Sequence, residues 1–197
     1  MESKFEILRE LLAADRSTRQ FEESRAINRE ELEKIVGLVE LCASGRNAQP
    51  LRYRLVVGDD ERHRLYPLLK WAGYYTDWDG PEVSERPAAY IVQCLDTNHG
   101  RDCLADDGIE LQAITLGATA LGMRCCIIKA FNAPQTSAEL AIPERYAPRY
   151  VVALGYPAEK IALEKMDGTD NADFKYYRTS DGVHHVPKRP LSERIIG

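Results

Sequence analysis

The sequence contains no long hydrophobic run and no cysteine pattern typical of a metal or disulfide site. No apolar stretch approaches the roughly 20 residues that a membrane-spanning helix needs, and residues 1–10 are acidic and amphipathic, unlike a signal peptide. The five cysteines are odd in number and include no C-x-x-C pair, which argues against a disulfide framework and a zinc knuckle. His99 and Cys103 are four residues apart, but no further ligands accompany them at suitable spacing. We therefore expect a cytoplasmic protein with no metal site and no membrane partner.

The chain also lacks an excess of positive charge. Its net charge of −5 argues against nucleic acid or an anionic membrane as a general partner. The hydrophobic fraction of 44% and the charged fraction of 29% are ordinary for a soluble globular protein. No repeat, low-complexity tract or boundary divides the 197 residues, and a chain of this length buries enough surface to fold as one unit. We predict a single domain over residues 1–197.

The stretch 106–123 predicts a long buried helix. Asp106 and Asp107 are acids that suit the positive end of a helix dipole and can cap free backbone N–H groups, and Gly122 suits the C-terminal end. Most positions between them are Ile, Leu, Ala or Gly, which indicates burial on most sides. Gly117 costs about 1 kcal/mol relative to alanine in a helix interior. Its presence suggests that another backbone or a flat ligand comes close there, although a plain core helix is the alternative.

Helices and strands alternate along the rest of the chain. Two of the expected helices open with a capping box, Asn28 with Glu31 and Thr136 with Glu139. Hydrophobic periodicity and turn residues predict helices at 3–14, 29–42, 60–67 and 136–142, strands at 53–57, 88–95, 124–131 and 150–154, and a hairpin at 181–182. This alternation indicates an α/β or α+β class.

Basic side chains gather at two places. Arg16, Ser17 and Arg19 follow the first helix and offer two guanidinium groups and a hydroxyl, which suit a phosphate monoester. Each charge-assisted hydrogen bond of this kind contributes on the order of 1.5–3 kcal/mol. Lys188 and Arg189 form a second basic cluster near the C-terminus. The alternative for the first segment is a solvated charged turn.

Two loops carry side chains that suit a planar ligand. The loop after helix 29–42 contains Asn47 and Gln49, whose amides can hydrogen-bond to the edge of a heterocycle, although a plain turn explains them as well. Residues 71–86 form an unusually long loop with several aromatic residues, and loops of this length are often lids or binding loops. Packing of these aromatic residues over the core is the alternative.

Several motifs occur in one order along nearly the whole chain: Arg16-Ser17-x-Arg19-x-Phe21, Asn47-x-Gln49-Pro50, Asp107-Gly108-Ile109, Cys126-Ile127-Ile128 and Ala153-Leu154-Gly155-Tyr156-Pro157. In this order the chain resembles the nitroreductase family of FMN-dependent NAD(P)H oxidoreductases. The resemblance implies an α+β fold with three α/β/α layers. In that fold a mixed, mainly antiparallel central sheet is flanked by helices, one of which is long and buried.

The resemblance also implies a homodimer with FMN at the subunit interface. Arg16, Ser17 and Arg19 would hold the phosphate and ribityl chain, together with Lys188 and Arg189. Asn47, from the partner subunit, would meet the edge of the flavin ring. The remaining implied cofactor-binding residues are Gln49, Gly155, Ile128 and Lys129, the last two through their backbone near the flavin face.

The implied activity is hydride transfer from NADH or NADPH through flavin N5 to a nitroaromatic, a quinone or a similar small oxidant, by a ping-pong mechanism. The chemistry belongs to the flavin, so no catalytic acid, base or nucleophile is expected from the protein. Alternatives on the same fold are reductive dehalogenation, flavin processing, or flavin binding with negligible turnover.

The chain departs from the family pattern in three places. Asp15 stands where a basic residue is often found. Ser44 and Gly45 replace the usual proline-serine pair before Asn47, and Lys129 replaces a small glycine.

Overall fold

A four-stranded antiparallel sheet forms the centre of the computed structural model, which describes residues 3–99, 105–166 and 174–197. The strands lie in the order β1-β2-β4-β3, and every neighbouring pair is antiparallel. Their bounds are β1 (Leu51–Val56), β2 (Ala89–Asp96), β3 (Arg124–Ile128) and β4 (Tyr146–Gly155).

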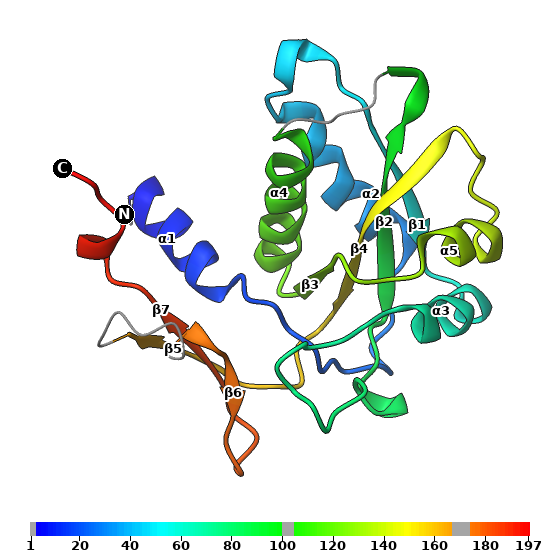
Figure 1. The fold of residues 1–197 in the computed structure, drawn as a ribbon. Helices are drawn as coiled ribbons and strands as arrows, with labels where there is room; N and C mark the ends of the chain where they lie inside the picture. The colour runs from blue at the N-terminus through cyan, green and yellow to red at the C-terminus, as the bar shows by residue number, and fades with distance from the viewer. Residues whose placement is uncertain (1–2, 100–104, 167–173) are drawn as a thin grey trace.

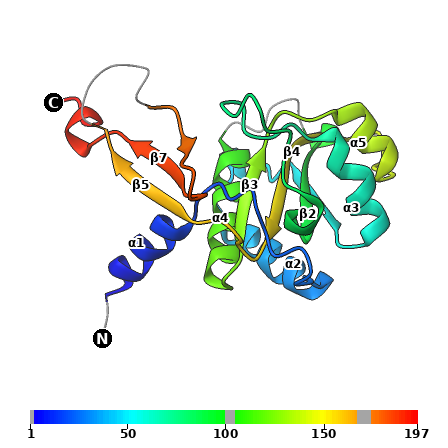
Figure 2. The same cartoon turned by 90° about the horizontal axis from the view of Figure 1, so that it is seen from below.

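Helices cover both faces of this sheet (Figures 1 and 2). One face packs against α2 (Arg29–Val36) and α4 (Asp106–Ala120), and the other packs against α3 (Asp59–Leu65) and α5 (Ala133–Glu139). Side chains alternate between the two cores, since Ile91 of β2 packs in the first core while Tyr90 and Val92 pack in the second. Because both faces are covered, all of β2 is buried.

We call the central sheet and the four helices that cover it the body. A smaller unit lies beside the body and is built from both ends of the chain (Figure 1). It contains α1 (Lys4–Ala14) and a second sheet in the order β5-β7-β6, with bounds β5 (Ile161–Lys165), β6 (Tyr177–Arg178) and β7 (His184–Lys188). We call these elements the arm. The strands β5 and β7 are parallel, and β6 and β7 are antiparallel. No residue of α1 is buried.

The three-layer α+β fold is confirmed, with an antiparallel central sheet and a long helix against it. The central helix α4 ends before Gly122, whose φ of +81° is the left-handed conformation that glycine adopts most easily. The expected hairpin is also present, with Gly182 at φ +83° between β6 and β7. None of the helices in the described part of the chain combines the length and apolarity needed to cross a membrane.

Two predicted helix starts are wrong in detail. Thr136 is not a cap: α5 begins earlier, where the Asn132 side chain accepts a hydrogen bond from the Gln135 N–H, and a proline stands in the first turn. Asp106 does not cap α4, because its carboxylate is directed to the loop before β1. The predicted helix 29–42 is an α-helix only up to Val36. The following residues form the 3₁₀ helix η1 (Gly37–Leu41). The capping box between Asn28 and Glu31 is confirmed.

Two glycines illustrate different packing constraints. A Cβ added at Gly155 would lie 2.8 Å from Cδ1 and 2.9 Å from Cβ of the buried Phe21. At Gly117 the nearest atom is the flexible Cδ1 end of Leu38 in η1, so a side chain, rather than a backbone, fills the space that the sequence indicated there.

We expect Gly155→Ala to lower the free energy of unfolding by about 1–3 kcal/mol, because Phe21 cannot move away without disturbing the core. In Gly117→Ala the better helix propensity of alanine, worth about 1 kcal/mol, offsets the rotation of Leu38. Urea unfolding of both variants beside the parent protein measures the difference. Equal losses would show that something less flexible than Leu38 faces Gly117.

Candidate functional site

The segment 15–21 is held between the body and the arm. Its residue Thr18 donates a backbone hydrogen bond to the Cys125 carbonyl of β3 at 3.0 Å, and the Gln20 carbonyl accepts from the Ala158 N–H at 2.9 Å. Bridges pair Ser17 with Cys125 and Phe21 with Pro157. The segment therefore runs alongside β3 and the loop after β4, which fixes where its arginines lie.

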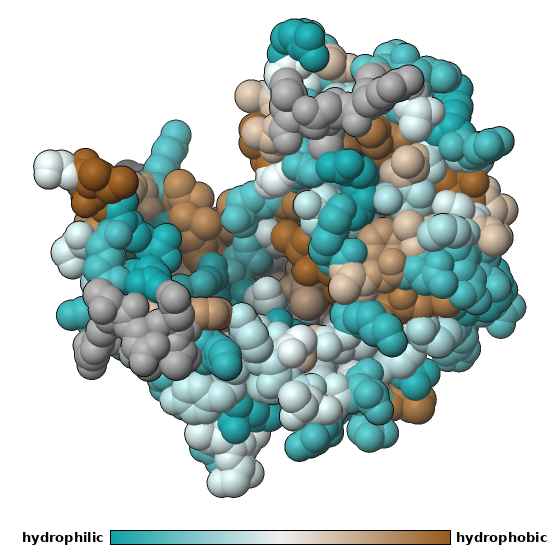
Figure 3. Space-filling model, viewed as in Figure 1, coloured by the Kyte–Doolittle hydropathy of each residue, from teal (hydrophilic) through white to brown (hydrophobic). Residues whose placement is uncertain are grey.

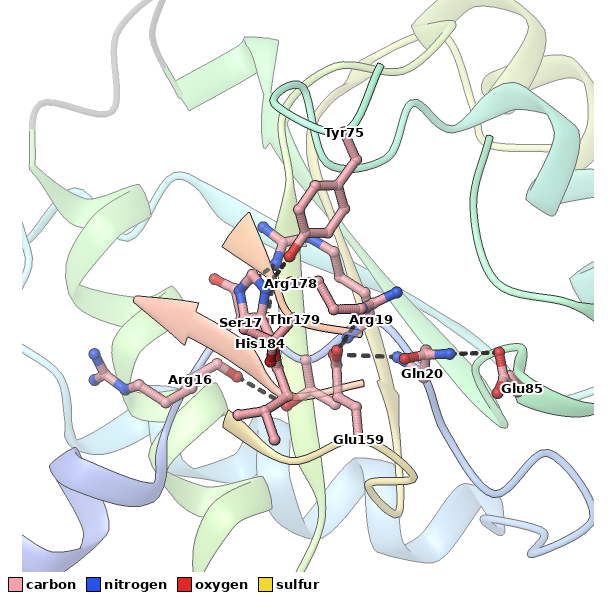
Figure 4. Close-up of polar contacts among 12 residues, drawn as sticks. Arg16, Ser17, Arg19, Gln20, Tyr75, Glu85, Glu159, Arg178, Thr179 and His184 are labelled. Atoms are coloured by element: carbon pink, nitrogen blue, oxygen red, sulfur yellow. Dashed lines mark hydrogen bonds and ion pairs between the residues drawn. The ribbon is translucent and has the colours of Figure 1, made fainter. Parts of the chain in front are cut away.

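Arg16 and Ser17 lie beside a hollow between the arm and the body. The surface is indented between these two parts (Figure 3). A pocket next to Arg16 and Ser17 belongs to the segment 15–21, α4 and β3 and is lined by Asp15, Arg16, Ser17, Gln112, Thr115, Cys125 and Ile127. The Arg16 side chain extends away from the other polar residues of the segment (Figure 4) and donates to the Leu12 carbonyl at 2.7 Å. Ser17 is exposed.

The structure brings Lys188 of β7 close to Arg16. Burial lowers the pKa of the Lys188 ammonium, and the positive charges of Arg16 and Arg194 lower it further. The charge contribution shows that the two guanidinium groups lie near the ammonium, although desolvation is the larger cause of the shift. Arg189, in contrast, pairs with Glu193 at 3.0 Å. Arg194 was missed by the sequence analysis, because no short motif contains it.

Arg19 is buried and faces the arm. Its Nη1 donates to the Ser17 carbonyl and to His184 Nε2, both at 3.2 Å, and its guanidinium lies 4.7 Å from the centre of the Tyr176 ring. Because a guanidinium only donates, Nε2 of His184 accepts, and the ring proton lies on Nδ1. That proton is directed to the Tyr75 hydroxyl. Arg19, His184 and Tyr75 thus form a hydrogen-bonded chain from the N-terminal segment to the loop 71–86 (Figure 4).

Glu159 connects the segment 15–21 to the second sheet. Its carboxylate accepts from the backbone N–H groups of Arg19 and Gln20 and pairs with Arg178 at 2.8 Å. Its side chain is 1% exposed. Sequence analysis missed Glu159, His184 and Tyr75, because their roles depend on contacts between segments far apart in the chain.

Asn47 and Gln49 lie elsewhere on the molecule. Both are exposed and lie in the loop before β1, which contacts the first turn of α4 at Asp106. Ser17, in contrast, lies near Thr115, further along α4. A helix rises about 1.5 Å per residue, so positions 106 and 115 of α4 are roughly 13 Å apart along its axis. The described chain therefore does not bring Asn47 and Gln49 beside Arg16.

The remaining predicted residues lie at opposite ends of β3, with Ile128 and Lys129 at its last residue and beyond, and Gly155 paired with its first residue. Ile128 is buried at the end of β3. Lys129 is exposed, donates to the Arg149 carbonyl at 3.1 Å and lies 4.4 Å from the centre of the Tyr150 ring, so its side chain folds back along β4. Gly155 packs against Phe21.

The thiols near this region are unreactive. Burial raises the pKa of Cys94 to about 12 and also raises the pKa values of Cys125 and Cys126, so these cysteines stay protonated at neutral pH. The described residues contain no group of three or more His, Cys, Asp or Glu side chains placed to hold a metal ion, and Cys103 lies outside them.

The donors of this region fit a phosphate-bearing cofactor. In the described part of the chain, the Nε atoms of Arg16 and Arg19 are buried without a hydrogen-bond partner, as are those of Arg62 and Arg86 elsewhere in the fold. These atoms are therefore available to an acceptor but do not by themselves identify one. Phosphate oxygens are acceptors of the required kind.

Burial of His184 makes stability depend on pH. Burial first, and then the charges of Arg19 and Arg178, lower the pKa of His184 to about 4, whereas an unfolded histidine titrates near 6.5. Between these values the unfolded state binds more protons. We expect the free energy of unfolding to fall as the pH drops from 6.5 to 4, by up to about 1.4 kcal/mol per pH unit from this group.

Urea unfolding between pH 7 and pH 4.5 tests this, by comparison of the parent protein with His184→Gln. The variant should show a shallower loss in this window, whereas His63→Gln, at an exposed histidine, should follow the parent curve. Identical slopes for all three proteins would contradict the burial of a neutral His184.

Comparison with models of known protein families gives no match, and comparison with curated proteins gives no significant match. Solved structures, however, are similar. A nitroreductase family protein from Streptococcus pneumoniae TIGR4 is 16% identical with a TM-score of 0.67, over 96% of this chain and 99% of that chain. An FMN-dependent nitroreductase from Clostridium difficile R20291 is 20% identical with a TM-score of 0.63, over 83% and 92% of the two chains. The NADPH:FMN oxidoreductase from Vibrio harveyi, complexed with NAD+, is 23% identical with a TM-score of 0.58, over 76% and 68%. This chain therefore has the fold of the nitroreductase family proteins.

Proposed function

We propose that this chain is an FMN-dependent oxidoreductase that transfers electrons from NADH or NADPH to a small organic oxidant, such as a nitroaromatic or a quinone. The observation that carries the proposal is the position of Arg16 and Ser17 on a pocket that is also lined by α4 and β3, with Lys188 and Arg194 near enough to Arg16 for their charges to interact. In a nitroreductase fold this is a suitable place for a phosphate. The structural similarity to an FMN-dependent nitroreductase and to an NADPH:FMN oxidoreductase also supports this proposal.

The chain's own residues bind and orient the cofactor in this proposal. Arg16 and Lys188 supply charge to the phosphate, and the exposed Ser17 hydroxyl supplies a hydrogen bond. When bound, FMN supplies two-electron transfer between a nicotinamide and the oxidant. Arg19 supplies a fixed positive charge, because the neutral His184 and the Ser17 carbonyl hold its guanidinium. Such a charge stabilises negative charge that develops in the site.

The loop 71–86 limits access of water in this proposal. Tyr75 bonds to His184, and Trp78 packs edge-on against Tyr75 with ring centres 5.8 Å apart. Arg178 lies over both rings, 5.2 Å from each centre. The loop is thereby attached to the arm next to Arg19, and a change in the loop would reach Arg19 through His184.

The direct test is the colour of the protein purified without added cofactor. We expect a yellow protein that releases FMN on acid treatment and is bleached by NADH or NADPH without air, with turnover when a quinone or nitroaromatic is added. A yellow protein that NAD(P)H does not bleach would indicate flavin binding without turnover. A colourless protein that takes up no added FMN would refute the proposal.

The phosphate assignment predicts which substitutions weaken binding. Lys188→Ala and Arg16→Ala each remove a charge-assisted hydrogen bond worth on the order of 1.5–3 kcal/mol, so we expect FMN to bind roughly 10- to 100-fold more weakly. Quenching of FMN fluorescence during titration of the apoprotein gives the affinity. Lys34→Ala, which removes an exposed lysine from α2, is the matched control and should bind like the parent. Unchanged FMN affinity in both Lys188→Ala and Arg16→Ala would show that these two residues do not bind the phosphate.

A second copy of the chain would complete the site in a homodimer. Asn47 and Gln49 lie away from Arg16 within one chain, and in this proposal a second copy brings them to the same cofactor. The arm offers an apolar surface for such a partner, since Phe5 and Leu8 of α1 are 69% and 46% exposed, and Ile127 beside the hollow is 42% exposed. Exposed apolar groups of this extent on one side are typical of an interface.

We expect the protein to elute as a dimer and Leu8→Asp to shift it toward the monomer with weaker FMN binding, because a carboxylate would be buried in the interface. Light scattering on a sizing column gives the mass. Val83→Asp makes the same kind of change at an apolar side chain that is 62% exposed in the 3₁₀ helix η4 (Val83–Glu85), away from α1, and should remain dimeric. A parent protein that is monomeric with FMN bound would contradict the shared site.

A further inference from the structure

The loop between η1 and β1 has an unfavourable backbone conformation. Three of its residues other than glycine have a positive φ: Arg46 at 55°, Asn47 at 55° and Gln49 at 44°. Side chains with a Cβ seldom adopt this left-handed region, and several such residues in one loop persist only when surrounding contacts hold them. Something outside the loop must therefore fix its shape.

Asp106 provides that contact. Its side chain is on the first turn of α4, and the residue is 2% exposed. The Ser44 hydroxyl donates to Oδ2 at 2.6 Å, and the Gly45 N–H donates to Oδ1 at 2.9 Å. Both carboxylate oxygens thus accept from the start of the loop, and the positive end of the α4 dipole stabilises the buried charge.

Ser44 carries this contact to the other end of the loop. Its Oγ donates to Asp106 and accepts from the Gln49 N–H at 2.8 Å. A carboxylate, a hydroxyl and a backbone amide therefore connect residues 44 and 49 to the rigid helix. Ser44 is one of the positions at which this chain departs from the family pattern. Its hydroxyl links Asp106 to the Gln49 N–H.

The loop held in this way presents two amide side chains in a defined arrangement. Gln49 Nε2 donates to Asn47 Oδ1 at 3.1 Å and to the Asn47 carbonyl at 3.3 Å. Within the loop, the Asn47 N–H donates to the Ser44 carbonyl at 2.9 Å. Gln49 occupies one acceptor site of the Asn47 side-chain oxygen, and the Asn47 NH₂ group is the donor of that side chain.

We propose that Asp106 is a positioning residue for the cofactor site: through Ser44 it holds the loop 44–49 so that Asn47 and Gln49 contact the flavin ring. The identity of the ligand rests on the proposed function, whereas the restraint on the loop does not. Asp106 touches no cofactor itself and acts only through the loop.

Amide hydrogen exchange in the apoprotein tests the restraint without FMN. We expect exchange of residues 44–50 to be about tenfold faster in Asp106→Asn, because an amide oxygen replaces only one of the two acceptors. Ser44→Ala should speed exchange in the same segment, and Ser44→Thr, which keeps the hydroxyl, should restore it. Asp60→Asn makes the same change at an exposed carboxylate in the first turn of α3 and should leave the segment unchanged. Exchange of residues 59–65 in each variant reports whether the fold is intact.

FMN titration then tests the positioning role. We expect Asp106→Asn to weaken FMN binding about fivefold or more in the parent background and to have little further effect in a background that carries both Asn47→Ala and Gln49→Ala. Two residues that act through one contact are not additive, whereas a general loss of stability would lower affinity in both backgrounds.

The outcomes distinguish the restraint on the loop, the positioning role of Asp106 and the proposed function. Equal exchange of residues 44–50 in the parent, Asp106→Asn and Ser44→Ala would overturn the restraint. Faster exchange with no effect of Asp106→Asn or Asn47→Ala on FMN affinity would overturn the positioning role. In that case, weaker binding by Lys188→Ala would still support the proposed function. A protein that takes up no FMN would refute the proposed function and the positioning role together, while the exchange result would still decide the restraint.

Discussion

The buried carboxylate of Glu159 is the interaction on which the site depends. It lies just before β5 and accepts from the backbone of Arg19 and Gln20 while it pairs with Arg178 of β6. A buried charge is unfavourable unless donors surround it, and removal of one partner from a buried pair commonly costs about 3–5 kcal/mol. The N-terminal segment and the second sheet are therefore held in one arrangement. Glu159 therefore joins the backbone at Arg19 to the sheet whose strand β7 carries Lys188.

Features encoded by neighbouring residues could be predicted from the sequence. The Asn28–Glu31 capping box, the end of α4 at Gly122 and the turn at Gly182 depend on residues only a few positions apart. The motif containing Arg16, Ser17 and Arg19 was also recognisable, because its residue types suit a phosphate without reference to the fold.

Features that depend on distant contacts could not be predicted. The parallel pairing of β5 with β7 joins Ile161 to His184, and nothing in either short strand specifies the other. The bond between Tyr75 and His184 spans 109 positions. The sequence suggested helix capping for Asp106, since an acid at the start of a helix usually serves it. The loop before β1 offered Asp106 a hydroxyl and an amide instead, and this competition is decided only by the packing of η1 against α4.

The three departures from the family pattern have local explanations. The Asp15 carboxylate accepts from Gln112 at 2.6 Å and from Thr115 at 2.7 Å, so it joins the end of α1 to α4. Its charge is thereby satisfied by α4. Lys129 is directed along β4, over Tyr150. Together with Ser44, these residues show that the unusual side chains hold neighbouring elements in place.

The electrostatics of the arm favour an anion even though the whole chain is acidic. The net charge is −5, yet Lys188 lies near Arg16 and Arg194 with its pKa lowered by burial and by both guanidinium groups. In the proposed function, a phosphate that binds near these cations offsets the repulsion among them. Because β7 carries Lys188 and the segment after α1 carries Arg16, this repulsion exists only when both ends of the chain are in place. The arm is therefore the part of the fold that brings Lys188 toward Arg16.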